Sequence, residues 1–132
     1  MISPKIKTYL KEHDVTYETI PHVNAITASE TAQVSHISGK HIAKSVALKV
    51  DGKVSLVALP ANRRLNLRSF QKETNAQNVE VMREYEFEDK FEDCEVGAMP
   101  PLGELYNVDL YLADSLAQQN WIAFNGGNHQ EL

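Results

Sequence analysis

The stretch HIAKSVALKVDGKVSLVALP, residues 41–60, decides the fold, because it holds two strand patterns joined by a tight turn. Asp51-Gly52 is a dipeptide that strongly favours a two-residue hairpin, since both positions tolerate positive φ. Residues 41–50 and 53–59 are therefore predicted to pair as antiparallel strands. The rest of the chain is expected to build around this hairpin.

Lys44 stands in the first of these strands, at a position where an apolar residue belongs. Side chains two apart on a strand share a face, so Lys44 is expected to line up with Val46, Leu48 and Val50. Burying an ammonium without a partner costs on the order of several kcal/mol. Lys44 therefore snorkels from the strand's beginning, pairs with a structural carboxylate, or awaits an anionic ligand.

The composition narrows the class of protein. A chain of 132 residues suits one domain, and 42% hydrophobic with 23% charged residues is close to the globular average. The single cysteine, Cys94, excludes an internal disulfide, and the first residues contain no apolar run for a signal or a membrane span. A cytoplasmic protein is expected. The net charge of −5 argues against coating long nucleic acids but permits contact with a short terminus.

Cap and turn residues predict the remaining elements. Ser3-Pro4 predicts a helix that ends near His13, and Thr27 with Glu30 has the spacing of a capping box before a helix over 28–36. The other predicted elements are strands at 15–20, 78–82, 108–112 and 121–124, a helix capped by Asn66, a helix over 83–91, and a turn at 125–128. A single α+β domain over residues 1–132 follows.

The segment GAMPPLG, residues 97–103, is predicted to be a stiff loop. Gly97 and Gly103 permit backbone conformations forbidden to other residues, while Pro100 and Pro101 fix φ and lack an N–H. The remaining amides are then held in place and can orient a water or stabilise an oxyanion. A rigid surface turn is the simpler interpretation of the same residues.

His129 and Cys94 are the other candidate reactive groups. His129 follows a Gly-Gly turn, where it can hydrogen-bond a substrate or move a proton, or else be simply solvated. Cys94 can act as a nucleophile, although a single thiol in this context is typical of a structural residue. The other four histidines form no zinc spacing with Cys94, and the sequence has no nucleophile elbow, P-loop or dinucleotide fingerprint. No metal and no cofactor are expected.

Taken together, IAKSVALKVDGKVSLVALP, the helix at NLRSF, the loop EVGAMPPLG and the late FNGGNH resemble the YbaK/prolyl-tRNA synthetase editing-domain family of aminoacyl-tRNA deacylases. The resemblance covers nearly the whole chain. Its two hallmarks are a strand lysine, matched by Lys44, and a G-x-x-x-P loop, matched by Gly97 to Pro101. A histidine after the last glycine turn, shared with many members, falls on His129.

The resemblance implies a bent, mainly antiparallel mixed β-sheet closing toward a barrel, with helices packed outside and a pocket between the lysine strand and the loop. It implies a trans-editing hydrolase that deacylates mischarged aminoacyl-tRNA carrying a small amino acid. The expected partner is the tRNA 3′ acceptor end, with an aminoacyl-tRNA synthetase as a further one. Neither a membrane nor DNA is an expected partner.

In the reaction that the family implies, Lys44 would hold the terminal phosphate or ribose. The amides of Gly97, Ala98 and Met99 would position the carbonyl and the attacking water. Family members are thought to enlist a substrate hydroxyl, so no base from the protein is needed. Further contacts with the substrate are expected from Pro100, Pro101, Leu102, His129, Thr27 and Tyr17.

The chain departs from the family pattern at two places. Many members carry Asp in the strand before the last turn, where this chain has Ala113 followed by Asp114. Members also usually continue past the position of Leu132 into a final strand and helix, so either the chain is trimmed here or this C-terminal element is missing, and the outer wall of the pocket could be affected. Two other functions stay open. The chain could bind an aminoacylated tRNA terminus or a small nucleotide without hydrolysing it, or it could dock on a synthetase.

Overall fold

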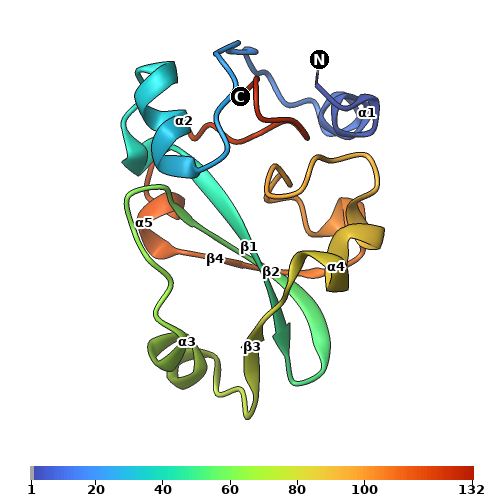
Figure 1. Cartoon of the computed structure of the whole chain (residues 1–132), viewed down its shortest axis with the longest axis vertical. Helices are drawn as coiled ribbons and strands as arrows, with labels where there is room; N and C mark the ends of the chain where they lie inside the picture. Colours follow the sequence, from blue (N-terminus) through green and yellow to red (C-terminus); the bar gives the residue numbers. More distant parts are fainter. Residues whose placement is uncertain (1) are drawn as a thin grey trace.

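The predicted hairpin forms the centre of the molecule. The computed structural model describes residues 2–132 (Figure 1), in which β1 (Ala43–Val50) pairs antiparallel with β2 (Lys53–Pro60). Asp51 and Gly52 have φ angles of 47° and 84°. Positive φ at both turn positions is the geometry that this dipeptide favours, so the hairpin prediction is confirmed.

The sheet has four strands in the order β3-β1-β2-β4. β3 (Val79–Val81) pairs antiparallel with β1, whereas β4 (Asp109–Leu112) pairs parallel with β2. The predicted α+β class and mixed, mainly antiparallel sheet are therefore confirmed. The sheet stays open, because β3 and β4 form its two edges and do not pair with each other; closure toward a barrel is not found.

Helices lie around this sheet (Figure 1), and their starts follow the predicted caps. The Thr27 side chain accepts a hydrogen bond from the Glu30 N–H, and the Asn66 side chain accepts one from the Ser69 N–H. The helices are α1 (Pro4–Glu12), α2 (Ala28–Ser35), α3 (Leu67–Thr74), α4 (Glu84–Phe87) and α5 (Asp114–Ala117), with short 3₁₀ turns η1 (Gly39–His41), η2 (Glu88–Phe91) and η3 (Glu104–Tyr106).

Two predicted strands are wrong. Residues 15–20 are extended but pair with no strand among residues 2–132: the Val15 N–H donates to the Leu10 carbonyl, and Ile20 exchanges two backbone hydrogen bonds with Leu132. Residues 121–124 form a single bridge, between Ala123 and Ile42, and Trp121 is exposed rather than buried. Alternating apolar residues are as typical of an unpaired extended segment with one apolar side as they are of a strand. The pattern does not indicate whether another strand will pair with the segment.

The helix predicted over residues 83–91 is divided into α4 and η2. Phe87, where the two meet, has a φ of −127°, which breaks the helical path. Phe87 and Phe91 then both enter the core, with their rings 6.3 Å apart. The backbone conformation at Phe87 is therefore set by the burial of the two aromatic side chains, which outweighs the local helix propensity.

The sheet has two apolar faces, which matter for the site. One face carries Leu48 and Val57 and is covered by Phe70 of α3. The other carries Ala47 and Leu56, which pack against a cluster of side chains from residues 82–106: Met82, Phe87, Phe91, Met99 and Tyr106. No helix among residues 2–132 is both long and apolar enough to cross a membrane.

Candidate functional site

The Gly97–Gly103 loop is fixed by packing, as predicted. Ala98, Met99, Pro100 and Pro101 are buried, and Met99 packs in the core cluster of Ala47. Gly97 has a φ of 86°, in the region that favours glycine. The loop is therefore packed against the core, which supports the predicted stiffness.

The amides of this loop are not equivalent. The Ala98 N–H donates to the Glu95 carbonyl at 3.0 Å, which closes a turn and commits that donor. The N–H groups of Gly97 and Met99 have no hydrogen-bond partner among residues 2–132. Of the three predicted amides, Gly97 and Met99 are thus the ones available to a bound carbonyl or water.

His129 lies directly against the loop. Its ring is 3% exposed, so it is not the solvated residue that its place near the chain end allowed. Nε2 lies 2.8 Å from the Val96 carbonyl and must be the protonated nitrogen in that hydrogen bond. Nδ1 is buried without a hydrogen-bond partner, and in this tautomer it can accept a hydrogen bond from a ligand. A Cβ on Gly97 would lie 3.5 Å from the imidazole Cε1.

Other buried polar side-chain atoms among residues 2–132 also lack a hydrogen-bond partner, and one of them lies on a segment bonded to the C-terminus. His22 and Ala25 belong to a segment tied to the C-terminus, since their N–H groups donate to the carbonyls of Gln130 and His129. The unpaired atoms are His22 Nε2, Ser45 Oγ, Asn125 Oδ1 and His129 Nδ1. Buried polar groups are normally satisfied, so these atoms mark the neighbourhood as a binding-site candidate.

Ser45 lies at a gap in the sheet. The edge of β1 is bridged by Ala123 at Ile42 and paired with β3 from Leu48 onward. Between them, the only other contact of this edge is the Met82 N–H, which donates to the Ala47 carbonyl at 3.0 Å. The edge at Ser45 is therefore left without a neighbouring strand. An extended ligand can reach the backbone there.

Lys44 lies on the predicted face of β1 and is partly buried. Burial lowers the pKa of its ammonium below the usual value, and the nearby Arg64 guanidinium lowers it further. Within residues 2–132, no carboxylate lies within ion-pair distance of Lys44. The interpretation in which Lys44 pairs with a structural carboxylate is therefore wrong.

Strand alternation separates Lys44 from the loop. Lys44 shares its face with Leu48 and Val50, whereas Met99 packs against Ala47 on the other face. The ammonium therefore does not project from β1 directly at the loop. A ligand in contact with both has to pass the open edge at Ser45.

Three residues that were expected to contact the substrate lie in other parts of the fold: Tyr17, Thr27 and Leu102. Thr27 caps α2, and Leu102 packs against the apolar side of α1. Tyr17 lines a mostly apolar groove of about 700 Å³ between α1, residues 15–20 and residues 120–124. The structure groups Gly97 to Pro101 with His129, and it does not bring these three residues to the same place.

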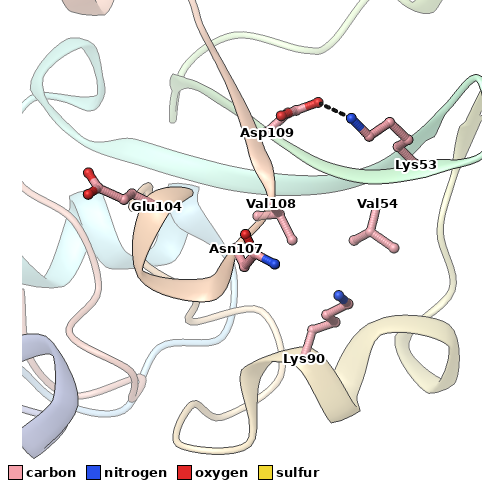
Figure 2. Close-up of a pocket in the computed structure, with 7 residues that line it drawn as sticks. All are labelled: Lys53, Val54, Lys90, Glu104, Asn107, Val108 and Asp109. Carbon is pink, nitrogen blue, oxygen red and sulfur yellow. Dashed lines mark ion pairs between the residues drawn. The ribbon is translucent and has the colours of Figure 1, made fainter.

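A second hollow, of about 450 Å³, lies at the far end of the hairpin (Figure 2). It is open, with a lining that is polar and apolar in about equal parts, and the ion pair of Lys53 with Asp109, 3.6 Å apart, stands at its rim. None of the predicted site residues lines it.

Cys94 belongs to a buried polar network rather than to a reactive centre. Its Sγ lies 3.2 Å from the Tyr106 hydroxyl, which donates to the Asp93 carboxylate at 3.0 Å. The Ser3 hydroxyl donates to the same carboxylate instead of capping α1. Burial raises the pKa of the Cys94 thiol to about 11. A thiol that stays protonated at neutral pH is a poor nucleophile, so the structural interpretation of Cys94 holds.

The sequence pattern of the aminoacyl-tRNA editing domain matches residues 22–132. The chain belongs to the aminoacyl-tRNA editing domain family. The strand of Lys44 and the loop at Gly97 both lie inside the matched range. No curated protein sequence matches the chain significantly.

Solved structures share the editing-domain fold. The hypothetical protein APE2540 superposes with a TM-score of 0.83 at 22% identity, over 96% of this chain and 85% of that one. A protein proposed to be a trans-editing enzyme for prolyl-tRNA synthetase superposes with a TM-score of 0.80 at 19% identity, over 100% of this chain and 86% of that one. At these identities the likeness establishes a common fold.

Sequence reasoning missed part of the editing domain's candidate site. Ser45 stands between Ala43 and Ala47 on one face of β1, and a polar residue between two alanines was a usable signal. His22 and Asn125 gave no signal, because only the tertiary fold buries them. Among residues 2–132, no cluster of His, Cys, Asp or Glu could hold a metal ion.

Proposed function

We propose that the protein is a trans-editing deacylase, which hydrolyses the ester between a small, wrongly attached amino acid and the 3′ adenosine of a tRNA. One observation carries the proposal: the loop at Gly97 offers fixed hydrogen-bond donors beside a buried imidazole, while no activated nucleophile accompanies them. Fixed donors without a nucleophile suit attack by a positioned water.

In this mechanism the free N–H groups of Gly97 and Met99 polarise the ester carbonyl and stabilise the oxyanion that forms on it. The oxygen of water attacks the carbonyl carbon, the bond from that carbon to the ribose oxygen breaks, and the ribose oxygen takes up a proton. His129 Nδ1 accepts a hydrogen bond from the water or from the substrate's ammonium. A neighbouring hydroxyl of the substrate takes the part that a basic side chain would otherwise play, so the protein needs no base of its own.

Lys44 binds the negative charge of the terminal nucleotide in this proposal. Its ammonium lacks a counter-ion and has a lowered pKa, so a phosphate beside it would restore the favourable environment of the charged form. The nucleotide would cross the open edge of β1 to reach the loop on the other face. A cytoplasmic location belongs to the same proposal, since charged tRNA is its substrate.

The proposed preference for small side chains follows from the size of what surrounds the loop. Ala98 is fully buried, and the face of the sheet that packs against the loop carries three alanines, Ala43, Ala47 and Ala58, beside the larger Leu56. A pocket that selects by size discriminates between side chains that differ by one methylene by only about 1–3 kcal/mol of binding free energy. A synthetase therefore makes errors of this kind, and a second, separate selection step can remove them.

A non-catalytic binding module is the second candidate, because Lys44 and the loop arise on opposite faces of the sheet. Deacylation of tRNAs mischarged with alanine, serine, cysteine or threonine separates the two. The deacylase releases at least one of these amino acids with turnover, and the rate scales with protein concentration. Binding of the same tRNAs without release would overturn the deacylase proposal, and absence of both would favour a docking domain.

A further inference from the structure

The start of β1 presents an exposed pair of stacked rings. The rings of His41 and Trp121 lie 4.1 Å apart and are almost parallel, at 6°. His41 Nδ1 also lies 3.2 Å from the Trp121 carbonyl, so a hydrogen bond fixes the pair. Trp121 is 51% exposed and adds little to the core. A fixed, exposed aromatic surface of this kind is a platform on which a nucleic-acid base can stack.

Positive charge surrounds this ring pair. Lys40 neighbours His41 in η1, and η1 packs on the segment after β2, where the Ala61 N–H donates to the Gly39 carbonyl at 3.0 Å. Asn62 lies beside Gly39 of η1, and Arg63 and Arg64, which follow Asn62 directly in the chain, are both exposed. The charge of Arg64 also reaches Lys44, the first cation of β1.

The charge distribution along the chain is strongly uneven. Residues 31–72 contain eight Lys or Arg and one acidic residue, Asp51, a net charge of +7, whereas the whole chain carries −5. Asp51 stands in the hairpin turn at the other end of β1. Two helices pack against η1, and each carries one acidic residue, Glu30 of α2 and Asp114 of α5. Four of the eight, Lys40, Lys44, Arg63 and Arg64, lie at or beside the start of β1, whereas Lys49 and Lys53 lie toward the hairpin turn and Arg68 and Lys72 lie on α3.

We propose that His41, Trp121, Lys40, Arg63 and Arg64 form a docking platform for the single-stranded 3′ end of a tRNA. One base stacks on the ring pair, and the three cations contact the phosphates on either side. This platform rests on the proposed function and adds to it the residues that bind RNA outside the reaction centre. It explains how an acidic protein can bind a polyanion by a short contact.

Trp121 is the only tryptophan of the chain, so its fluorescence reports on the platform directly. The probe is a 12-nucleotide single-stranded RNA ending in CCA, and its binding is followed in parallel by the anisotropy of a labelled copy. The platform predicts saturable quenching of Trp121 with the same midpoint as the anisotropy change. Binding seen by anisotropy without quenching would overturn the platform.

Two double variants test the cations. Arg63→Ala with Arg64→Ala is expected to weaken binding about tenfold or more and to reduce the slope of log K against log salt by about 1.4, since each single-strand phosphate contact contributes about 0.7. Lys72→Ala with Lys90→Ala makes the same change in net charge at exposed positions on α3 and η2, and it should stay within twofold of the parent. Equal losses in both would mean that total charge binds the RNA and no platform exists.

Ring variants test the stacking. His41→Ala is expected to weaken binding about fivefold or more, and His41→Phe should restore most of it, because a flat ring suffices for stacking. A loss in His41→Phe as large as in His41→Ala would reject stacking on this pair.

The platform and the proposed activity can fail separately. If the parent protein hydrolyses a mischarged tRNA and kcat/KM is unchanged in the Arg63→Ala, Arg64→Ala variant, the platform is wrong and the deacylase stands. If the parent binds the RNA through Trp121 yet releases no amino acid, the deacylase is wrong and the platform stands.

Discussion

The Gly97–Gly103 loop and the start of β1 contribute to the proposed site in opposite ways. Packing and a turn hydrogen bond hold the loop, and buried side chains continue through four of its residues. At the start of β1, Lys44 has no counter-ion among residues 2–132 and Ser45 stands at a strand edge without a neighbour. In the proposed reaction, the donors that would meet developing charge are held by packing, whereas the cation that would meet the nucleotide has no counter-ion among residues 2–132 before the substrate binds.

The largest effect is expected at the unsatisfied charge. Lys44→Ala should lower kcat/KM for a mischarged tRNA by about 100-fold, because the cation that positions the nucleotide is lost. The free energy of unfolding should not fall, since the variant removes a partly desolvated cation that has no partner. Lys49→Ala is the control, as Lys49 lies on the same strand but on the other face. If Lys44→Ala and Lys49→Ala had equal activity, Lys44 would not take part in binding the substrate.

A smaller effect is expected at the rigid loop. Gly97→Val forces a β-branched residue to a φ of 86° and should lower kcat about 30-fold while changing KM little, because the amide donors move. Gly52→Ala is a matched control, since Gly52 has a φ of 84° with open space around it in the hairpin turn. That variant should lose stability but keep its activity. Equal losses in kcat and in binding for Gly97→Val would argue against water or oxyanion positioning.

The far end of the loop should affect stability alone. A Cβ on Gly103 would stand 2.6 Å from the Val108 carbonyl oxygen and 2.9 Å from the Leu110 Cβ. Gly103→Ala should therefore lower the free energy of unfolding by about 2 kcal/mol, measured by urea denaturation. If the free energy of unfolding changed by less than about 0.5 kcal/mol, the loop would have moved to accommodate the new methyl group. The contrast between a rigid loop and the start of β1 would then be lost.

The smallest effect on activity is expected at Cys94. Cys94→Ser should keep hydrolysis within about twofold of the parent. With a pKa raised from 9.0 to about 11, the thiol stays protonated in the folded state, so alkylation by iodoacetamide should be slow at pH 8 and accelerate up to about pH 11. Because the unfolded chain loses this proton first, stability should fall as the pH rises from 9 to 11. Rapid alkylation at pH 7 would contradict the buried network.

Local chemistry made the hairpin and the helix starts predictable. Asp51-Gly52, Thr27 and Asn66 act through their own backbone or through residues up to three positions along the chain. The orientation of Lys44 was predictable for the same reason, since it depends only on alternation along β1.

Long-range packing was not predictable in the same way. The parallel pairing of β2 with β4, and the burial of Phe87 and Phe91 that divides a helix, depend on residues far apart in the sequence. The position of the loop relative to Lys44 is of the same kind. Strand alternation indicates a face, but it does not indicate which segment will cover that face.

The hydrogen bond from Ser3 to Asp93 connects α1 to the segment that precedes Gly97, although the family's sequence pattern begins only at residue 22. A fragment trimmed to that pattern would retain every diagnostic motif and still lose the anchor that α1 provides. The residues that match the family pattern are therefore fewer than the residues that hold the Gly97–Gly103 loop in place.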